Sequence, residues 1–192
     1  MRRLSILVVC LALSVCMDKA WAQDPFAAFQ KKDYAAAFAG FEALAAEGNP
    51  NAMNNLGLML ANGLGVETDF GAARQWYEKA AGAGHVGAMN NLGAMYEMGQ
   101  GTGQNFLEAA KWYRAAADNG LSDAQYNLAA LYESGHGLTA DPLQAYVWYS
   151  LAARQGDQDA ATARDRLAKA VDPALRGQAD AFVKTWKVAG QP

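Results

Sequence analysis

The sequence contains only two histidines, the residue type that most often acts as a metal ligand or a general base at neutral pH. The two histidines, His85 and His136, are 51 residues apart, and no spaced set of cysteine, histidine or acidic residues accompanies either one. Metal binding and acid–base catalysis both need several such groups to converge. We therefore expect both histidines to be solvent-exposed loop residues, and we predict no catalytic residue, no metal ligand and no cofactor.

The serines are also poor candidates for nucleophilic catalysis. Beyond residue 22 they are Ser122, Ser134 and Ser150, and none starts a Ser-x-x-Lys motif or lies in Gly-x-Ser-x-Gly. Carboxylates that are distant in sequence can still meet in space. Catalysis by such carboxylates therefore stays open as an alternative.

Three Gly-x-Gly segments spaced 36 residues apart suggest either a phosphate-binding loop or a shared backbone turn. They begin at Gly63, Gly99 and Gly135. A phosphate-binding loop follows a strand and is followed by a lysine, whereas these segments lie between two expected helices. All three copies keep both glycines, as a common turn with unusual backbone angles would require. The pattern favours the turn.

The strongest signal is a repeat of 36 residues. One register aligns alanines, asparagines, leucines, glycines and a Trp-Tyr pair in successive copies. The aligned positions include Ala52, Ala88, Ala124 and Ala160; Asn55, Asn91 and Asn127; Leu56, Leu92 and Leu128; Trp76, Trp112 and Trp148; Tyr77, Tyr113 and Tyr149.

Each copy is predicted to form two helices. In the first copy, Ala52, Leu56 and Met59 lie on one face of a helix over about 52–62, which Gly63 ends. Asp69 then stands where a helix N-cap is preferred, as Asn105 and Asp141 do in the later copies. The chain is thus expected to be all-α.

The ends carry incomplete copies. We divide the chain into N-terminal capping helices with a half repeat (23–51), three repeats (52–87, 88–123 and 124–159) and C-terminal capping helices (160–192). The last helix should open at Asp172-Pro173, with Leu175, Ala179, Phe182 and Trp186 on its packed side. Stacked arrays need such caps because an open end exposes apolar surface.

The repeat resembles the Sel1-like repeat, a relative of the tetratricopeptide repeat. The resemblance is carried by Ala-x-x-x-Leu-Gly-x-x-Tyr-x-x-Gly-x-Gly followed by Ala-x-x-Trp-Tyr-x-x-Ala-Ala-x-x-Gly, over residues 52–159. Leu60 and Ala129 depart from this pattern. It implies a right-handed α-solenoid. It also implies a protein–protein interaction adaptor. The alternatives that stay open are a cell-wall-directed enzyme or ligand binder, of the peptidoglycan or β-lactam type, and a periplasmic inhibitor of a sensor kinase.

By the same resemblance, the first helices line a concave groove that would bind an extended peptide or a protein loop. The residues that would face it are Asn54, Leu58, Asn90, Ala94, Glu97, Met98, Tyr126, Ala130 and Glu133. Asparagine amides can pair with a peptide backbone through a donor and an acceptor. For the adjacent asparagines, Asn55, Asn91 and Asn127, the competing interpretation is a bond between neighbouring repeats.

The remaining repeated positions are expected to pack in the interior. They are Leu56, Gly57, Leu92, Gly93, Leu128, Trp76, Tyr77, Trp112, Tyr113, Trp148 and Tyr149. The glycines would allow two helices to approach closely. The competing interpretation of the Trp-Tyr pairs is an exposed platform for stacking sugars.

The first 22 residues read as a secretory signal. Arg2 and Arg3 precede an apolar run, and Ala20-Trp21-Ala22 fits the small-x-small pattern before a cleavage site. We predict cleavage near Ala22-Gln23 and a periplasmic or secreted protein without membrane insertion after cleavage. A lipidated Cys16 is the alternative. We expect the mature chain to be a monomer.

Loss of residues 1–22 would remove Arg2, Arg3, Lys19 and Asp18, which changes the formal net charge from −3 to −5. An acidic chain without a basic stripe argues against nucleic acid as a partner. Both cysteines would also be lost, so no disulfide could stabilise the remainder.

Overall fold

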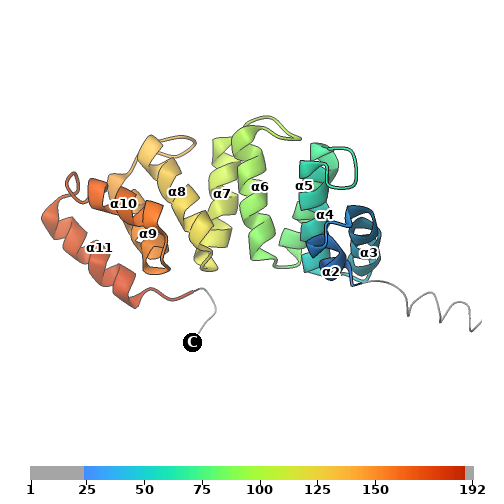
Figure 1. The fold of residues 1–192 in the computed structure, drawn as a ribbon. Helices are drawn as coiled ribbons and strands as arrows, with labels where there is room; N and C mark the ends of the chain where they lie inside the picture. The colour runs from blue at the N-terminus through green and yellow to red at the C-terminus, as the bar shows by residue number, and fades with distance from the viewer. Residues whose placement is uncertain (1–23, 189–192) are drawn as a thin grey trace, which may run out of the picture.

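The computed structural model describes residues 24–188, so the predicted signal segment lies outside the described residues. Within this range the chain forms helices and no strand, as predicted. The helices stack in chain order from one end of the molecule to the other (Figure 1). They are α2 (Pro25–Gln30), α3 (Tyr34–Ala46), α4 (Pro50–Asn62), α5 (Phe70–Gly82), α6 (Val86–Met98), α7 (Phe106–Asp118), α8 (Ser122–Ser134), α9 (Pro142–Arg154), α10 (Gln158–Leu167) and α11 (Pro173–Thr185).

Short polar residues start the helices and glycines end them. The side chains of Asp69, Asn105 and Asp141 accept hydrogen bonds from backbone N–H groups in the first turns of α5, α7 and α9, which confirms the predicted N-caps. Gly63 and its two repeat equivalents end the first helices with positive φ, in the left-handed region that glycine enters without steric cost. The first helices begin at Pro50, Val86 and Ser122, two residues before our repeat boundaries.

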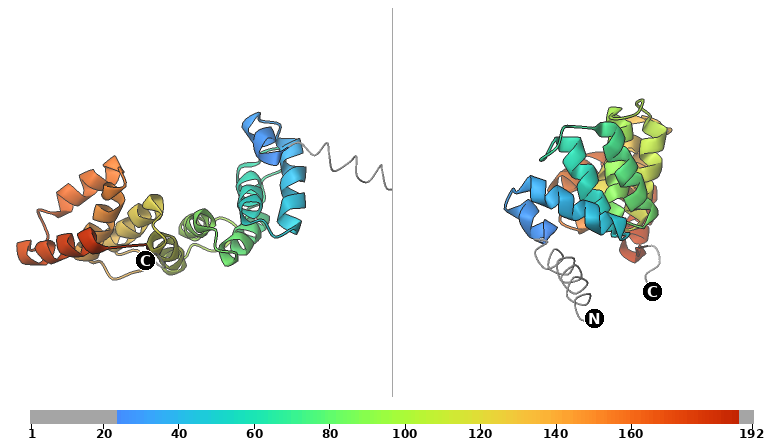
Figure 2. Two further views of the ribbon diagram at one scale, coloured as in Figure 1. Left: turned by 90° about the horizontal axis from the view of Figure 1, so that it is seen from below. Right: turned by 90° about the vertical axis from the view of Figure 1, so that its right-hand side faces the viewer.

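The helices pack as consecutive antiparallel pairs. Within each repeat the first helix packs on the second (α4 on α5, α6 on α7, α8 on α9), and each second helix then packs on the first helix of the next repeat. The stack follows an arc, as the left view of Figure 2 shows. Small alanines and the repeated leucines fill the interior, where Leu56, Leu92 and Leu128 are at most 1% exposed. The predicted α-solenoid is therefore confirmed.

Gly57 and Gly93 allow a tyrosine ring to lie directly on the first helix. A methyl group at Gly93 would come within 2.5 Å of the Tyr113 ring, and one at Gly57 within 2.7 Å of the Tyr77 ring. Both rings are about 2% exposed. The mid-helix glycines thus lower the helix propensity of the first helices, but they allow a large aromatic side chain to be buried against them.

The tryptophans of the Trp-Tyr pairs differ from one another. Trp148 is buried, whereas Trp76 and Trp112 are only half-buried, although we expected all three in the interior. Trp76 packs on the N-terminal core, with the Lys79 ammonium 4.1 Å from its ring centroid. Trp148 is covered because α11 packs on α9 at this end of the stack.

The terminal helix α11 buries less of its apolar side than we expected. Ala179 and Val183 are buried, but Leu175 and Phe182 are 45% and 51% exposed. The helix is tied to α9 by polar contacts as well: the Tyr146 hydroxyl donates to Asp180 across 2.7 Å, and the Arg154 guanidinium donates to the Val183 carbonyl.

His85 is not a free loop residue. It is half-buried and is the N-cap of α6, where its Nδ1 accepts a hydrogen bond from the Ala88 N–H at 3.0 Å. Burial lowers the pKa of His85. His136, in contrast, is exposed and stacks on Phe106 with ring centroids 4.8 Å apart.

Candidate functional site

The surface formed by α4, α6 and α8, here called the first-helix face, carries all nine residues that we predicted to line a groove. Eight of them are half-buried, and Met98 is 59% exposed. The structure does not gather them into one continuous cavity. Three of the nine line a hollow between α4 and α6, one lines a hollow between α8 and α10, and the other five line neither.

An amide ladder crosses the first-helix face. The Nδ2 group of Asn91 donates to Oδ1 of Asn54 at 3.1 Å, and Asn127 donates in the same way to Asn90 at 3.2 Å. Asn54 and Asn90, which we expected to bind a peptide backbone, therefore use their acceptor oxygens in hydrogen bonds to the next repeat. Asn55, at the start of the ladder, instead donates to the Asn51 carbonyl of its own helix.

The hollow between α4 and α6 has a volume of about 290 Å³. We call it the repeat 1–2 hollow. Three predicted groove residues line it, namely Leu58, Ala94 and Met98, and its wall combines apolar with polar side chains. The other lining residues are Ala61, Asn62, Phe70, Tyr77, Asn91, Met95 and Gln100.

Two glutamates of the first-helix face are held by tyrosines from the second helices. The Tyr113 hydroxyl donates to Glu97 at 2.7 Å, and the Tyr149 hydroxyl donates to Glu133 at 3.1 Å. Glu133 also forms an ion pair with Arg166 of α10, with nitrogen and oxygen 2.6 Å apart. Burial, together with these glutamates, raises the pKa values of both tyrosines, so both hydroxyls stay protonated donors.

The second hollow, of about 190 Å³, lies between α8 and α10. Tyr126 lines it, and its ring meets that of Tyr149 edge-on with centroids 5.3 Å apart. The remaining lining residues are Asn127 and three aspartates, Asp123, Asp157 and Asp159. This end of the face is therefore acidic, whereas the repeat 1–2 hollow contains no charged side chain.

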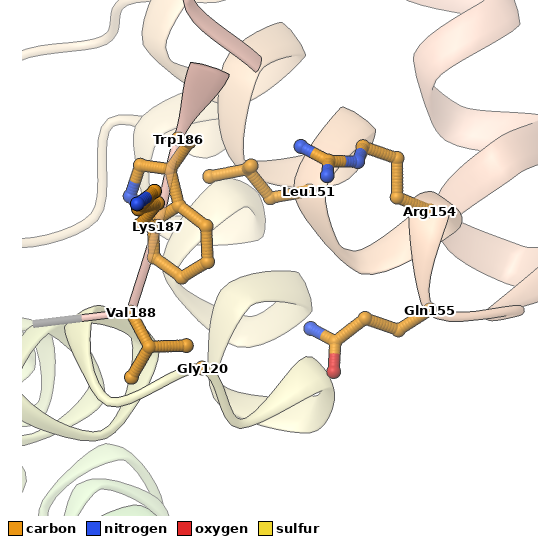
Figure 3. Close-up of a pocket in the computed structure, with 7 residues that line it drawn as sticks. All are labelled: Gly120, Leu151, Arg154, Gln155, Trp186, Lys187 and Val188. Atoms are coloured by element: carbon orange, nitrogen blue, oxygen red, sulfur yellow. The ribbon is translucent and has the colours of Figure 1, made fainter. Parts of the chain in front are cut away.

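A larger hollow, of about 400 Å³, lies away from this face, beside the C-terminal segment (Figure 3). Trp186 and Val188 reach across to the turn between α7 and α8, where a methyl group on Gly120 would come within 2.7 Å of the Val188 side chain. Gln155, on its wall, donates to Gln125 at 2.9 Å. Because Arg154 and Gln155 on its wall are already paired within the protein, we interpret this hollow as a packing seam of the C-terminal cap.

Neither a metal site nor a membrane span is found in the part of the chain that the structure describes. Residues 24–188 contain no group of three or more histidine, cysteine or acidic side chains placed to hold a metal ion. None of their helices has both the length and the apolar character needed to cross a bilayer.

The repeat itself identifies the family. The family description "Sel1 repeat" matches residues 50–85, 86–121 and 122–157, which together make up more than half of the chain. The chain belongs to the Sel1 repeat family. The matched boundaries coincide with the helix starts at Pro50, Val86 and Ser122. Sel1 repeats commonly mediate protein–protein interactions.

Two solved Sel1 structures resemble this Sel1 array. A Sel1 repeat protein from Oxalobacter formigenes is 38% identical with a TM-score of 0.68, and the match covers 71% of this chain and 56% of that one. The protein c5321, a protective antigen of uropathogenic Escherichia coli with an SLR fold, is 30% identical with a TM-score of 0.71; the match covers 78% of this chain and 32% of that one. The array thus spans about half and one third of their lengths. No curated protein matches the chain.

Sequence reasoning missed Phe70, Gln100 and Tyr77 as residues that line the repeat 1–2 hollow. Phe70 and Gln100 lie at or beside helix ends, where the repeat pattern carries no information on orientation. For Tyr77 a signal existed: Glu97 and Glu133 align with Ala61 in the 36-residue register, so the first copy lacks the partner that the other two tyrosines have.

Proposed function

We propose that this protein is a periplasmic or secreted adaptor that binds an extended peptide or a loop of another protein on its first-helix face. The observation that best supports this proposal is the repeat 1–2 hollow. Its wall is built from two repeats, combines apolar side chains with amides and a tyrosine, and bears the exposed Met98 on its surface. Pockets that combine apolar contacts with a few polar groups anchor one or two side chains of a bound segment, and such anchors supply most of the affinity.

The amide ladder modifies how the face would bind a backbone. Asn54 and Asn90 accept bonds from the next repeat, so their Nδ2 groups are the atoms left to donate to a bound carbonyl. Binding would therefore be by donation at two positions one repeat apart.

Site-specific photo-crosslinking in the periplasm tests the proposal. A photoreactive residue at Met98 should form adducts with a discrete partner. The same residue at the exposed Gln75 of α5, outside the first-helix face, should not. Enlarging the wall with Ala94→Trp should suppress the adducts at position 98. Equal adducts from positions 75 and 98 would refute the assignment of the face.

The location is tested separately by N-terminal sequencing of the protein from a periplasmic extract. Cleavage near Ala22-Gln23 gives a mature chain that begins at Gln23. A chain that begins with a lipid-modified Cys16, or recovery only from the cytoplasm, would contradict it.

A further inference from the structure

The hydroxyl of Tyr77 lacks the partner that its two repeat equivalents have. Tyr113 and Tyr149 donate to Glu97 and Glu133, whereas position 61 in the first repeat is alanine. Among the described residues no hydrogen-bond acceptor is recorded for the Tyr77 hydroxyl, although the side chain is only 2% exposed. Tyr77 lines the repeat 1–2 hollow together with Ala61.

The repeat geometry fixes where this hydroxyl points. In the second repeat the tyrosine ring lies on Gly93, and its hydroxyl reaches the side chain four residues further along α6, at Glu97. In the first repeat the ring lies on Gly57, and the residue four positions further along α4 is Ala61. The space that a glutamate carboxylate occupies in repeat 2 is thus part of the open hollow in repeat 1.

We propose that the repeat 1–2 hollow binds the carboxylate of a glutamate or aspartate side chain from the partner segment, and that this carboxylate accepts a hydrogen bond from Tyr77 in place of the glutamate missing at position 61. The flanking residues of that segment are apolar and pack on Leu58, Ala94 and Met98.

Three observations support a carboxylate rather than a basic or purely apolar side chain. The protein itself places a carboxylate against the equivalent hydroxyl in both other repeats. Burial raises the pKa of Tyr77 to about 12, so the group is a donor throughout the physiological range. No charged side chain lines the hollow to repel an anion, and the amide of Gln100 offers a further donor.

This inference rests on the proposed function, because it specifies the ligand chemistry of the same face. Its test uses three acetylated and amidated peptides, Ala-Leu-Glu-Leu-Ala and the same sequence with glutamine or lysine in place of glutamate. Titration of methionine-methyl-labelled protein reports on binding through the methyl signals of Met95 and Met98, which line the hollow. We expect the glutamate peptide to bind about tenfold more tightly than the other two, as one charge-assisted hydrogen bond would give.

Two variants and one control assign the effect. Tyr77→Phe removes only the unpartnered hydroxyl and should abolish the preference for glutamate. Ala61→Glu restores the internal partner and should block the hollow to all three peptides. Tyr113→Phe, which loses a hydroxyl already bonded to Glu97, should leave the preference unchanged.

The outcomes separate the two proposals. Equal shifts with all three peptides, or an unchanged preference in Tyr77→Phe, would overturn the carboxylate assignment even where partner adducts form at Met98. Absence of specific adducts at Met98 alongside a preserved glutamate preference would overturn the adaptor function and leave the carboxylate site standing.

Discussion

The side-chain amides of Asn91 and Asn54 join two repeats across the first-helix face, with Nδ2 of Asn91 3.1 Å from Oδ1 of Asn54. The next pair, Asn127 and Asn90, repeats the contact. Hydrogen bonds of this kind restrict how far neighbouring first helices can slide, because both groups are half-buried. The placement of neighbouring first helices therefore depends in part on side chains of the face that we propose to bind a partner.

Removal of one ladder donor should weaken the array. We expect Asn91→Ala to lower the free energy of unfolding by about 1 kcal/mol, since Asn54 loses its partner in a half-buried setting. Asn55→Ala is the matched control, because Asn55 bonds only to a carbonyl of its own helix. Urea unfolding of both variants measures the difference. Equal losses would show that the ladder adds nothing between repeats.

The close approach of Gly93 to Tyr113 predicts a penalty for a single methyl group. Gly93→Ala places a Cβ within 2.5 Å of the ring and should cost about 1–2 kcal/mol, despite the better helix propensity of alanine. Gly82→Ala, in open space on α5, should instead gain up to about 1 kcal/mol.

The third repeat provides a natural comparison for this prediction. Alanine stands at position 129, and there the Tyr149–Glu133 bond is 3.1 Å rather than 2.7 Å. The ring can thus shift to accept a methyl group, which is why we expect a moderate loss. Thermal melts that moved in the same direction for Gly93→Ala and Gly82→Ala would contradict the steric explanation.

The tryptophans should differ in their contributions to stability. Trp148 is 4% exposed, so Trp148→Ala should cost about 3–5 kcal/mol through a large cavity. Trp112→Ala should cost about 1–3 kcal/mol, because its ring is half-buried and solvent can fill part of the vacated space. Chemical denaturation monitored by circular dichroism compares the two directly. A larger loss at position 112 would contradict the burial seen here.

The helical stack could be predicted because the same residue spacing recurs in each repeat. Three copies of the same spacing fixed the helix pairs, the caps at Asp69, Asn105 and Asp141, and the turns after Gly63 and its equivalents. The burial of individual tryptophans could not be predicted in the same way. Trp112 and Trp148 occupy the same position of the repeat, and the packing of α11 on α9 helps to bury Trp148 alone.

The site residues were harder to predict than the fold. The repeat assigned Asn54 and Asn90 to the first-helix face, but it did not indicate whether their oxygens face a ligand or the neighbouring repeat. That choice depends on the distance between side chains of neighbouring first helices, which the residue spacing within one helix does not give. The open space beside Tyr77 depends instead on a difference between repeats, because Ala61 stands where the second repeat has Glu97. A search for residues that the repeats share does not detect such a difference.

His85 gives the array a stability that depends on pH. The equivalent N-cap of α4 is Asn49, which does not titrate, whereas neutral His85 caps α6 through Nδ1. Its pKa is lowered by burial below the usual 6.5, so the unfolded chain takes up the proton more readily than the folded one. The contribution is therefore intact above about pH 6.5 and is lost as the pH falls through 6.5 toward the lower folded-state pKa.

The variant His85→Asn, which copies the cap of α4, should reduce the loss of stability between about pH 7.5 and 5.5. Protonation of Nδ1 removes the acceptor for the Ala88 N–H, whereas an asparagine oxygen keeps it. His136→Asn is the matched control, because His136 is exposed and caps no helix. Urea unfolding at both pH values gives the difference between each variant and the wild type. If His85→Asn and the wild type lost the same stability on acidification, the cap would not be the titrating element.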